Sequence, residues 1–159
     1  MRFSLVELVL LAAAAALVAY AVVHKSGGGT PGVVRPASWT LTPGVLNPQV
    51  TPATVRSTIC RAGWTRTVRP PVGYTNELKL SQMRQYRRRG PPSAFQEDHL
   101  ISLELGGDPT DPRNLWPEPY PRAADVDRIE NDLNRRVCAG TLSLADAQRK
   151  ESVLKHTAG

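Results

Sequence analysis

Apolar residues fall into one long continuous run near the start of the chain and into shorter, interrupted groups after it. The continuous run covers residues 8–23 and lies after a basic residue, Arg2. It is short for a transmembrane helix but has the length of the apolar core of a signal peptide. We therefore interpret residues 1–25 as a signal peptide that exports the rest of the chain, with Ala19-Tyr20-Ala21 as its cleavage site. An uncleaved membrane anchor over residues 3–23 is the alternative, and it would export the same domain.

Residues 26–50 separate this run from the expected folded domain. They are rich in glycine and proline and have no apolar periodicity, which is typical of a linker. The folded domain is expected over residues 51–159, where Thr51-Pro52 has the form of a helix start. Three elements are expected in its first part: a helix over residues 53–60, a strand over residues 65–68 and a helix over residues 75–86.

The centre of the domain has the pattern of two short strands, joined by a polar loop and followed by a helix. The first strand begins at Asp98-His99 and continues through loosely alternating apolar residues to a turn at Gly106-Gly107. A loop rich in proline and aspartate then leads to a second short apolar segment, which begins at Asn114. Such a hairpin brings Asn114 back beside His99. In the helix, expected over residues 122–137, a buried stripe at helical spacing consists of Val126, Ile129, Leu133 and Val137.

The last element is an amphipathic helix within residues 141–156, with Ser143 as the capping residue. His156 lies near its end, and we interpret it as a solvent-exposed residue. Short strands among longer helices predict a small α+β domain.

Two cysteines, Cys60 and Cys138, lie in the part of the chain that we expect to be exported. Because disulfides persist in oxidising compartments, one bridge between them is the simplest interpretation. The bridge would join the first helix of the domain to the end of the helix after Asn114. Two buried free thiols are the alternative.

Basic residues are concentrated just before Asp98 in a chain whose formal net charge is +6. Guanidinium groups hold phosphate oxygens in a bidentate fork, so such a cluster favours a polyanionic partner. The alternative is a solvated helix end whose arginines complement the helix dipole. The cluster specifies no base sequence, and it consists of Arg84, Arg87, Arg88 and Arg89.

The central residues, in the order Asp98-His99, Gly106-Gly107 and Asn114-Leu115, resemble the motif of the HNH or His-Me finger endonucleases. The resemblance covers residues 95–137 and implies an α+β fold with a ββα-metal core flanked by helices. It also implies a nuclease that hydrolyses phosphodiester bonds with one divalent metal ion, Mg²⁺, Mn²⁺ or Zn²⁺. The chain lacks the cysteine pairs that many members use for a structural zinc ion. It also has Ala123 where the family has a helix histidine, and Ser102 where proline is common.

The resemblance assigns roles to the three polar residues of this motif. His99 is the general base that takes a proton from water, and Asp98 is a metal ligand. Consecutive strand residues point to opposite sides, so neighbours can serve these separate tasks. Asn114 fixes the orientation of the imidazole, because the partner of one ring nitrogen decides which nitrogen carries the proton.

A second metal ligand is expected on the helix after Asn114, where the acidic candidates are Asp125, Asp127 and Glu130. We favour Asp127, because it shares one flank of the apolar stripe with Glu130 and Asn131, and this flank could face the metal. The alternative for each candidate is a surface carboxylate that pairs with Arg128 or Arg135.

We therefore expect a monomeric, metal-dependent nuclease that binds the phosphates of DNA or RNA. It would be secreted, periplasmic or held at the membrane only by its N-terminal segment. Two other classes of function remain: a nucleic-acid-binding domain that has lost catalysis, and an interaction domain of the cell envelope.

Overall fold

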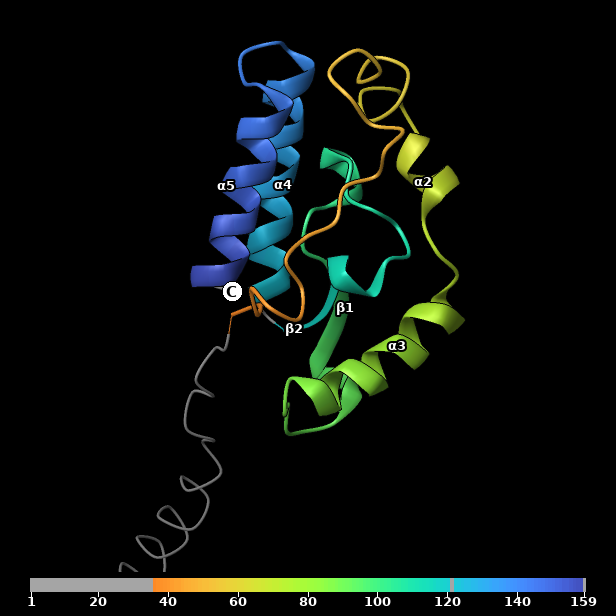
Figure 1. Ribbon diagram of the computed structural model, residues 1–159, viewed down its shortest axis with the longest axis vertical. Coiled ribbons are helices and arrows are strands. Elements are labelled where there is room, and N and C mark those ends of the chain that lie inside the picture. Colours follow the sequence, from red (N-terminus) through yellow and green to blue (C-terminus); the bar gives the residue numbers. More distant parts are fainter. Residues whose placement is uncertain (1–35, 121, 159) are drawn as a thin grey trace, which may run out of the picture. The chain divides into compact units, whose positions relative to one another are not determined.

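An antiparallel hairpin of two short strands, β1 (Phe95–His99) and β2 (Leu115–Pro119), lies between helices (Figure 1). Helix α3 (Val72–Gln85) packs against both strands, and helix α4 (Arg122–Cys138), on the other side, contacts β2. Helix α5 (Leu144–Thr157) lies beside α4. A short helix, α2 (Trp64–Val68), precedes α3. These elements form a small α+β domain, which confirms the predicted fold class.

This computed structural model describes residues 36–120 and 122–158, all of which belong to one unit of the chain, Val34–Gly159. The predicted signal peptide or anchor and the first part of the predicted linker lie outside the described residues. Within these two ranges, no helix is long and apolar enough to span a membrane.

His99 ends the first strand, whereas the sequence predicted that it begins one. The hairpin pairs Phe95 with Pro119 at one end and His99 with Leu115 at the other. The N–H of Leu100 still donates to the backbone carbonyl of Asn114 at 2.7 Å, but the next two N–H groups have side-chain partners: Asn114 Oδ1 accepts from Ile101 at 3.0 Å, and the Glu151 carboxylate accepts from Ser102 at 2.9 Å. The apolar residues after His99 therefore enter a loop with a 3₁₀ turn at Leu103–Leu105.

Close packing accounts for the two glycines of this loop. Gly106 has a φ of 80°, and a Cβ atom there would lie 2.5 Å from the side chain of Val50. A Cβ atom on Gly107 would lie 1.8 Å from the carbonyl oxygen of Ile101. Neither position tolerates a side chain, because the loop folds back tightly on itself and on the segment before α2.

Two predictions for the region before α3 are wrong. Residues 53–60 form successive turns in place of a helix. The hydroxyls of Ser57 and Thr58 both donate to the carbonyl of Thr54, and such bonds compete with a regular helical ladder. Residues 65–68 belong to α2, where burial of Trp64 in the core outweighs the strand propensity of the residues after it.

The three longer helices are confirmed, with α3 beginning at Val72, earlier than predicted. Ser143 caps α5, and its hydroxyl accepts from the N–H of Asp146 at 3.1 Å. Ile129 is 39% exposed, so its place in the buried stripe of α4 was predicted wrongly. Glu130, the next residue, is buried because Lys155 pairs with it.

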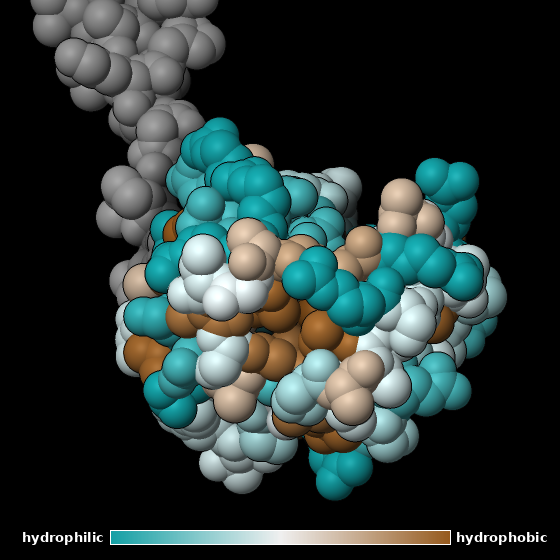
Figure 2. Space-filling model, turned by 90° about the horizontal axis from the view of Figure 1, so that it is seen from above, coloured by the Kyte–Doolittle hydropathy of each residue, from teal (hydrophilic) through white to brown (hydrophobic). Residues whose placement is uncertain are grey.

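The interior has two apolar clusters. On the surface, Figure 2 shows apolar side chains in the middle of one face, surrounded by hydrophilic ones. The smaller cluster consists of Ala37, Leu100 and Trp116, with Tyr86 packed against it. The larger consists of Val50, Ile59, Trp64, Ile101, Leu105, Leu133, Val137, Leu144 and Ala147.

Residues 36–50 pack on this domain and cover the last turn of α5. The N–H of Ala37 donates to the carbonyl of Lys155 at 2.9 Å, and the ring of Trp39 stacks on His156 with centroids 3.6 Å apart. His156 Nε2 lies 2.9 Å from the carbonyl oxygen of Thr42. The prediction that His156 is exposed was therefore wrong, because a segment distant in sequence buries it.

The predicted disulfide is confirmed: Cys60 and Cys138 are bonded, with their Cα atoms 5.5 Å apart. The bridge ties the turns before α2 to the last residue of α4.

Replacing both cysteines by alanine should lower the free energy of unfolding. The bridge closes a long loop, since the two residues are 78 positions apart, and the loss should be about 4 kcal/mol if chain entropy dominates. Urea denaturation of the two proteins, monitored by tryptophan fluorescence, measures this. Adding reductant to the double variant should change nothing further. Equal midpoints for the oxidised parent and the variant would contradict the prediction.

Candidate functional site

Burial and one backbone contact fix the imidazole of His99 at the end of β1. The residue is 5% exposed, and its Nε2 lies 3.0 Å from the carbonyl oxygen of Pro109. Because a carbonyl can only accept, Nε2 carries the proton in this contact and Nδ1 keeps its lone pair. Burial lowers the pKa of His99, and this outweighs the opposite effects of the Pro109 carbonyl and Asp98. The imidazole is therefore neutral near pH 7 and can accept a proton.

Asn114 was predicted to orient the imidazole of His99, but its side chain bonds backbone groups. Its amide donates to the carbonyl oxygens of Ile101 and Asp108, at 3.0 and 2.8 Å. Asp108 precedes Pro109, so Asn114 holds the loop segment whose carbonyl contacts His99. The orientation of the imidazole thus depends on Asn114 only indirectly, through this loop.

Asp98 points toward α5, and its carboxylate is held on both sides. Its Oδ2 lies 2.7 Å from Nζ of Lys155, and its Oδ1 accepts from Nε2 of Gln96 at 3.3 Å. Burial would raise the pKa of Asp98, but the ammonium of Lys155 overcomes this and lowers it below the ordinary value. Asp98 is therefore ionised near pH 7.

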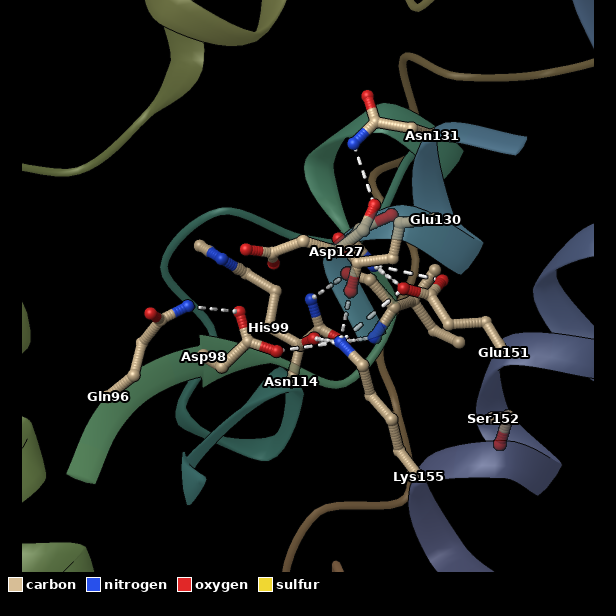
Figure 3. A network of polar contacts seen from close by, with 12 residues as sticks. Gln96, Asp98, His99, Asn114, Asp127, Glu130, Asn131, Glu151, Ser152 and Lys155 are labelled. Carbon is tan, nitrogen blue, oxygen red and sulfur yellow. Dashed lines mark hydrogen bonds and ion pairs between the residues drawn. The ribbon is translucent and has the colours of Figure 1, made fainter. Parts of the chain in front are cut away.

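Lys155 reaches from α5 into a group of acidic side chains behind the end of β1 (Figure 3). It is fully buried, and its ammonium donates to Asp98 and to the carbonyl of His99 and forms an ion pair with Glu130 at 2.6 Å. Glu151 lies one turn earlier on α5, with Oε1 3.5 Å from the ammonium nitrogen. Three elements therefore meet at one charge: β1, α4 and α5.

Sequence reasoning missed Lys155 and Glu151, although the chain carries a signal for them. On α5 the buried positions Leu144 and Ala147 continue at helical spacing to Glu151 and Lys155. A lysine and a glutamate in an apolar stripe indicate a buried ion pair, because each is almost never fully buried unless it is paired.

The acidic groups near Lys155 outnumber its single charge. Glu118 on β2 is 1% exposed, and burial raises its pKa to about 8. Burial also raises the pKa of Glu130 and of Glu151. We call Lys155 and these three glutamates the Lys155 cluster. Some of its carboxyls retain protons at pH 7.

Asp127 is the one candidate second ligand whose carboxylate is not engaged. Asp125 pairs with Arg128 on the surface, and Glu130 is held by Lys155. No described side chain bonds the carboxylate of Asp127, which points toward the end of β1 that carries His99 (Figure 3).

The electrostatic surroundings of Asp127 fit a cation. Burial raises its pKa, and the like charge of Asp98 raises it further. A cation that shared these two carboxylates would relieve that repulsion, and one or two carboxylates plus water is the usual protein site for Mg²⁺. Among residues 36–120 and 122–158, no group of three or more acidic, histidine or cysteine side chains is arranged to hold a metal ion.

Arg69 is a third residue that sequence reasoning missed. It is exposed just before α3, and its positive charge lowers the pKa of His99, of Asp127 and of Glu104. An exposed guanidinium thus lies within electrostatic reach of both His99 and Asp127. Nothing in its sequence context, a single arginine before two prolines, distinguishes it.

The predicted arginine cluster lies at the opposite end of α3. Tyr74 near the start of this helix bonds the carbonyl of Thr110, beside Pro109, whereas Arg84 lies near its end, roughly 15 Å further along the axis. Arg84, Arg87 and Arg89 are exposed. Arg88 differs, because its guanidinium lies 5.3 Å from the centroid of Tyr86 and 5.6 Å from that of Trp116.

Replacing Glu118 by glutamine should reduce the loss of stability at alkaline pH. Burial raises its pKa from 4.5 to about 8, so the folded state keeps a proton that the unfolded chain releases. Its contribution to stability is complete below about pH 4.5 and is lost as the pH rises through 8. Urea denaturation at pH 6, 7.5 and 9 should give a smaller decline for Glu118→Gln than for the parent. Glu77→Gln, on the exposed face of α3, is the matched control, and identical declines for the two variants would refute the assignment.

Comparison with protein-family models, with curated proteins and with solved structures finds no match to this chain in any of the three. The geometry of its own residues is therefore the basis for a functional interpretation.

Proposed function

We propose that this protein is a metal-dependent nuclease in which β1, the loop, β2 and α4 form a ββα core of the His-Me finger type. One observation carries the proposal. A neutral, buried imidazole with a defined proton position lies at the end of a hairpin, next to the ionised Asp98 and on the side toward which Asp127 points from α4. This is the arrangement that the resemblance in sequence implies.

Asp98 and Asp127 would hold the divalent ion. Two oxygen donors suit Mg²⁺ or Mn²⁺, whereas zinc sites use three or four ligands drawn mainly from histidine and cysteine. When bound, the ion supplies positive charge to the phosphate group and to the leaving oxygen.

His99 acts as the general base. Its Nδ1 takes a proton from a water molecule, whose oxygen attacks phosphorus while the bond from phosphorus to the leaving oxygen breaks. The carbonyl of Pro109 keeps the other ring proton on Nε2, so Nδ1 is available at the start of each cycle. The negative charge of Asp98 stabilises the imidazolium that forms.

Exposed arginines on one side of the domain would bind the substrate backbone. The positive charge of Arg69 lowers the pKa of His99, so Arg69 lies within electrostatic reach of the imidazole. The other three arginines lie at the far end of α3 or just after it: Arg84, Arg87 and Arg89. A nucleic acid strand that runs along α3 would contact both groups through its phosphates, which supports DNA or RNA as the substrate without a preference for sequence.

A nucleic-acid-binding domain without catalysis is the second candidate. The ion pair between Lys155 and Asp98 favours it, because an ammonium already neutralises the carboxylate that the metal would use.

The proposed export of the domain is supported by the disulfide, since such bonds persist outside the cytosol.

Replacing His99 by alanine should abolish most cleavage and leave the fold intact. The loss of a general base should lower the rate about a hundred-fold or more. The assay uses supercoiled plasmid and a structured RNA with Mg²⁺, Mn²⁺, Zn²⁺ or EDTA. Asp127→Ala should instead raise the metal concentration needed for half-maximal rate. Asp125→Ala, on the same helix but paired with Arg128, is the control and should behave as the parent. Unimpaired cleavage by His99→Ala would eliminate the nuclease proposal.

Replacing Arg84, Arg87 and Arg89 together by alanine should weaken binding and its dependence on salt. Each phosphate contact that is lost reduces the slope of log K against log salt by about 0.7 to 0.9. Binding of the His99→Ala protein to labelled DNA at several salt concentrations measures the slope without cleavage. A triple change of Arg128, Arg135 and Arg149, exposed on α4 and α5, is the control for net charge. Equal slopes for the two triple variants would place the substrate elsewhere.

A further inference from the structure

We propose that Lys155 is a positioning residue that holds the Asp98-His99 pair in its working geometry, so that α5 is part of the active site. The inference rests on the proposed nuclease function, and it extends the site beyond the hairpin and α4. It is carried by the contacts of one ammonium group with both members of the pair: the carboxylate of Asp98 and the backbone carbonyl of His99.

The contacts of the ammonium are all inside the protein. It donates hydrogen bonds to Asp98 Oδ2 and to the carbonyl oxygen of His99, and it forms an ion pair with Glu130 Oε1 at 2.6 Å. The side chain is also fully buried, without access to a bound strand. Lys155 therefore acts through the residues that it holds and not on the phosphate itself.

Each contact constrains a different feature of the site. The bond to Asp98 Oδ2 selects one orientation of that carboxylate and leaves Oδ1 on the side of Gln96. The bond to the His99 carbonyl fixes the peptide at the end of β1, where the ladder stops. Catalytic groups must be held within a fraction of an ångström of their working position, which requires such support.

Glu151, one turn before Lys155, constrains the same stretch of backbone. Both of its oxygens accept from the N–H of Ser102, at 2.9 and 3.0 Å. Helix α5 thus contacts residues 98, 99 and 102 through two side chains on one face. The hydrogen bonds of these two side chains to the hairpin and its loop converge on the segment that carries His99.

Stability alone does not account for this arrangement. Burying an ammonium costs several kcal/mol before its partners compensate, and well-packed apolar residues usually serve a core equally well or better. The Lys155 cluster also buries more carboxyl groups than one ammonium can neutralise. A fixed geometry at Asp98 and His99 is a benefit that an apolar core would not provide.

The test compares the parent protein with variants that lack the side-chain ammonium of Lys155. Lys155→Met removes the ammonium. Lys155→Met combined with Glu130→Gln removes the ammonium and also one of the carboxylates that it leaves without a partner. This double variant serves if the single variant does not fold. Glu130→Gln alone controls for the second change, and Lys150→Met, exposed on the same helix, controls for loss of a lysine. Circular dichroism and an intact disulfide establish that each protein is folded.

Two measurements are made on the folded variants. The rate of cleavage at saturating metal and substrate should fall on the order of a hundred-fold in the variants without the Lys155 ammonium, with little change in KM, and should stay at the parent value in Lys150→Met. The double variant is compared with Glu130→Gln, so that the effect of the second change is removed. In ¹H–¹⁵N spectra of the imidazoles, the parent should show His99 protonated at Nε2, and the variants without ammonium should show a mixture of tautomers. The His99→Ala protein assigns the signal.

The two proposals fail differently. A parent protein that does not cleave refutes the nuclease function, while the imidazole spectra still test whether Lys155 positions His99. A folded variant that keeps both the parent rate and the single tautomer shows that Lys155 serves stability only and overturns the inference. Failure of both the single and the double variant to fold would likewise make Lys155 a residue of the fold and overturn it.

Discussion

The buried ion pair between Lys155 and Asp98 is the interaction on which the arrangement around the hairpin depends. It brings α5 against the end of β1, and the contact with Glu130 brings α4 to the same point. The free energy lost by removing these charges from water is recovered only if the charges stay in close contact with one another. A shift of either helix would lengthen these contacts, so the ion pair fixes the relative positions of both helices and the strand.

The hairpin separates two electrostatic environments. Asp98 and Glu118 lie among buried acidic groups on the side of α4 and α5, whereas the other side has α3, with the exposed Arg84 in its last turn and the exposed Arg87 and Arg89 just after it. His99 lies where the hairpin ends, and burial keeps it neutral. A base that is uncharged, with an acidic residue behind it and cationic residues on the exposed surface, suits chemistry on an anion.

Local pattern was sufficient for part of this structure. The helices α3, α4 and α5 and the cap at Ser143 agree with apolar spacing and capping preferences, and the disulfide agrees with the bridge expected between the two cysteines of the chain. The end of β1 was not predictable, because side chains from Asn114 and Glu151 take the backbone N–H groups that a longer strand would use. His156 resembles a residue of a solvated helix end until a distant segment covers it. The partner of His99 is a loop carbonyl, and a carbonyl has no signature in sequence.

The order of the elements along the chain has a consequence for biosynthesis. The hairpin with Asp98 and His99 leaves the ribosome before α5 does, so the end of β1 has no ammonium beside it until the later helix has docked. The disulfide to Cys138 likewise waits for the last residue of α4 and for an oxidising compartment. In the exported nuclease that we propose, a nascent chain would then carry Asp98 and His99 without the contacts that arrange them, and the nucleic acids of the cell would meet an unassembled site.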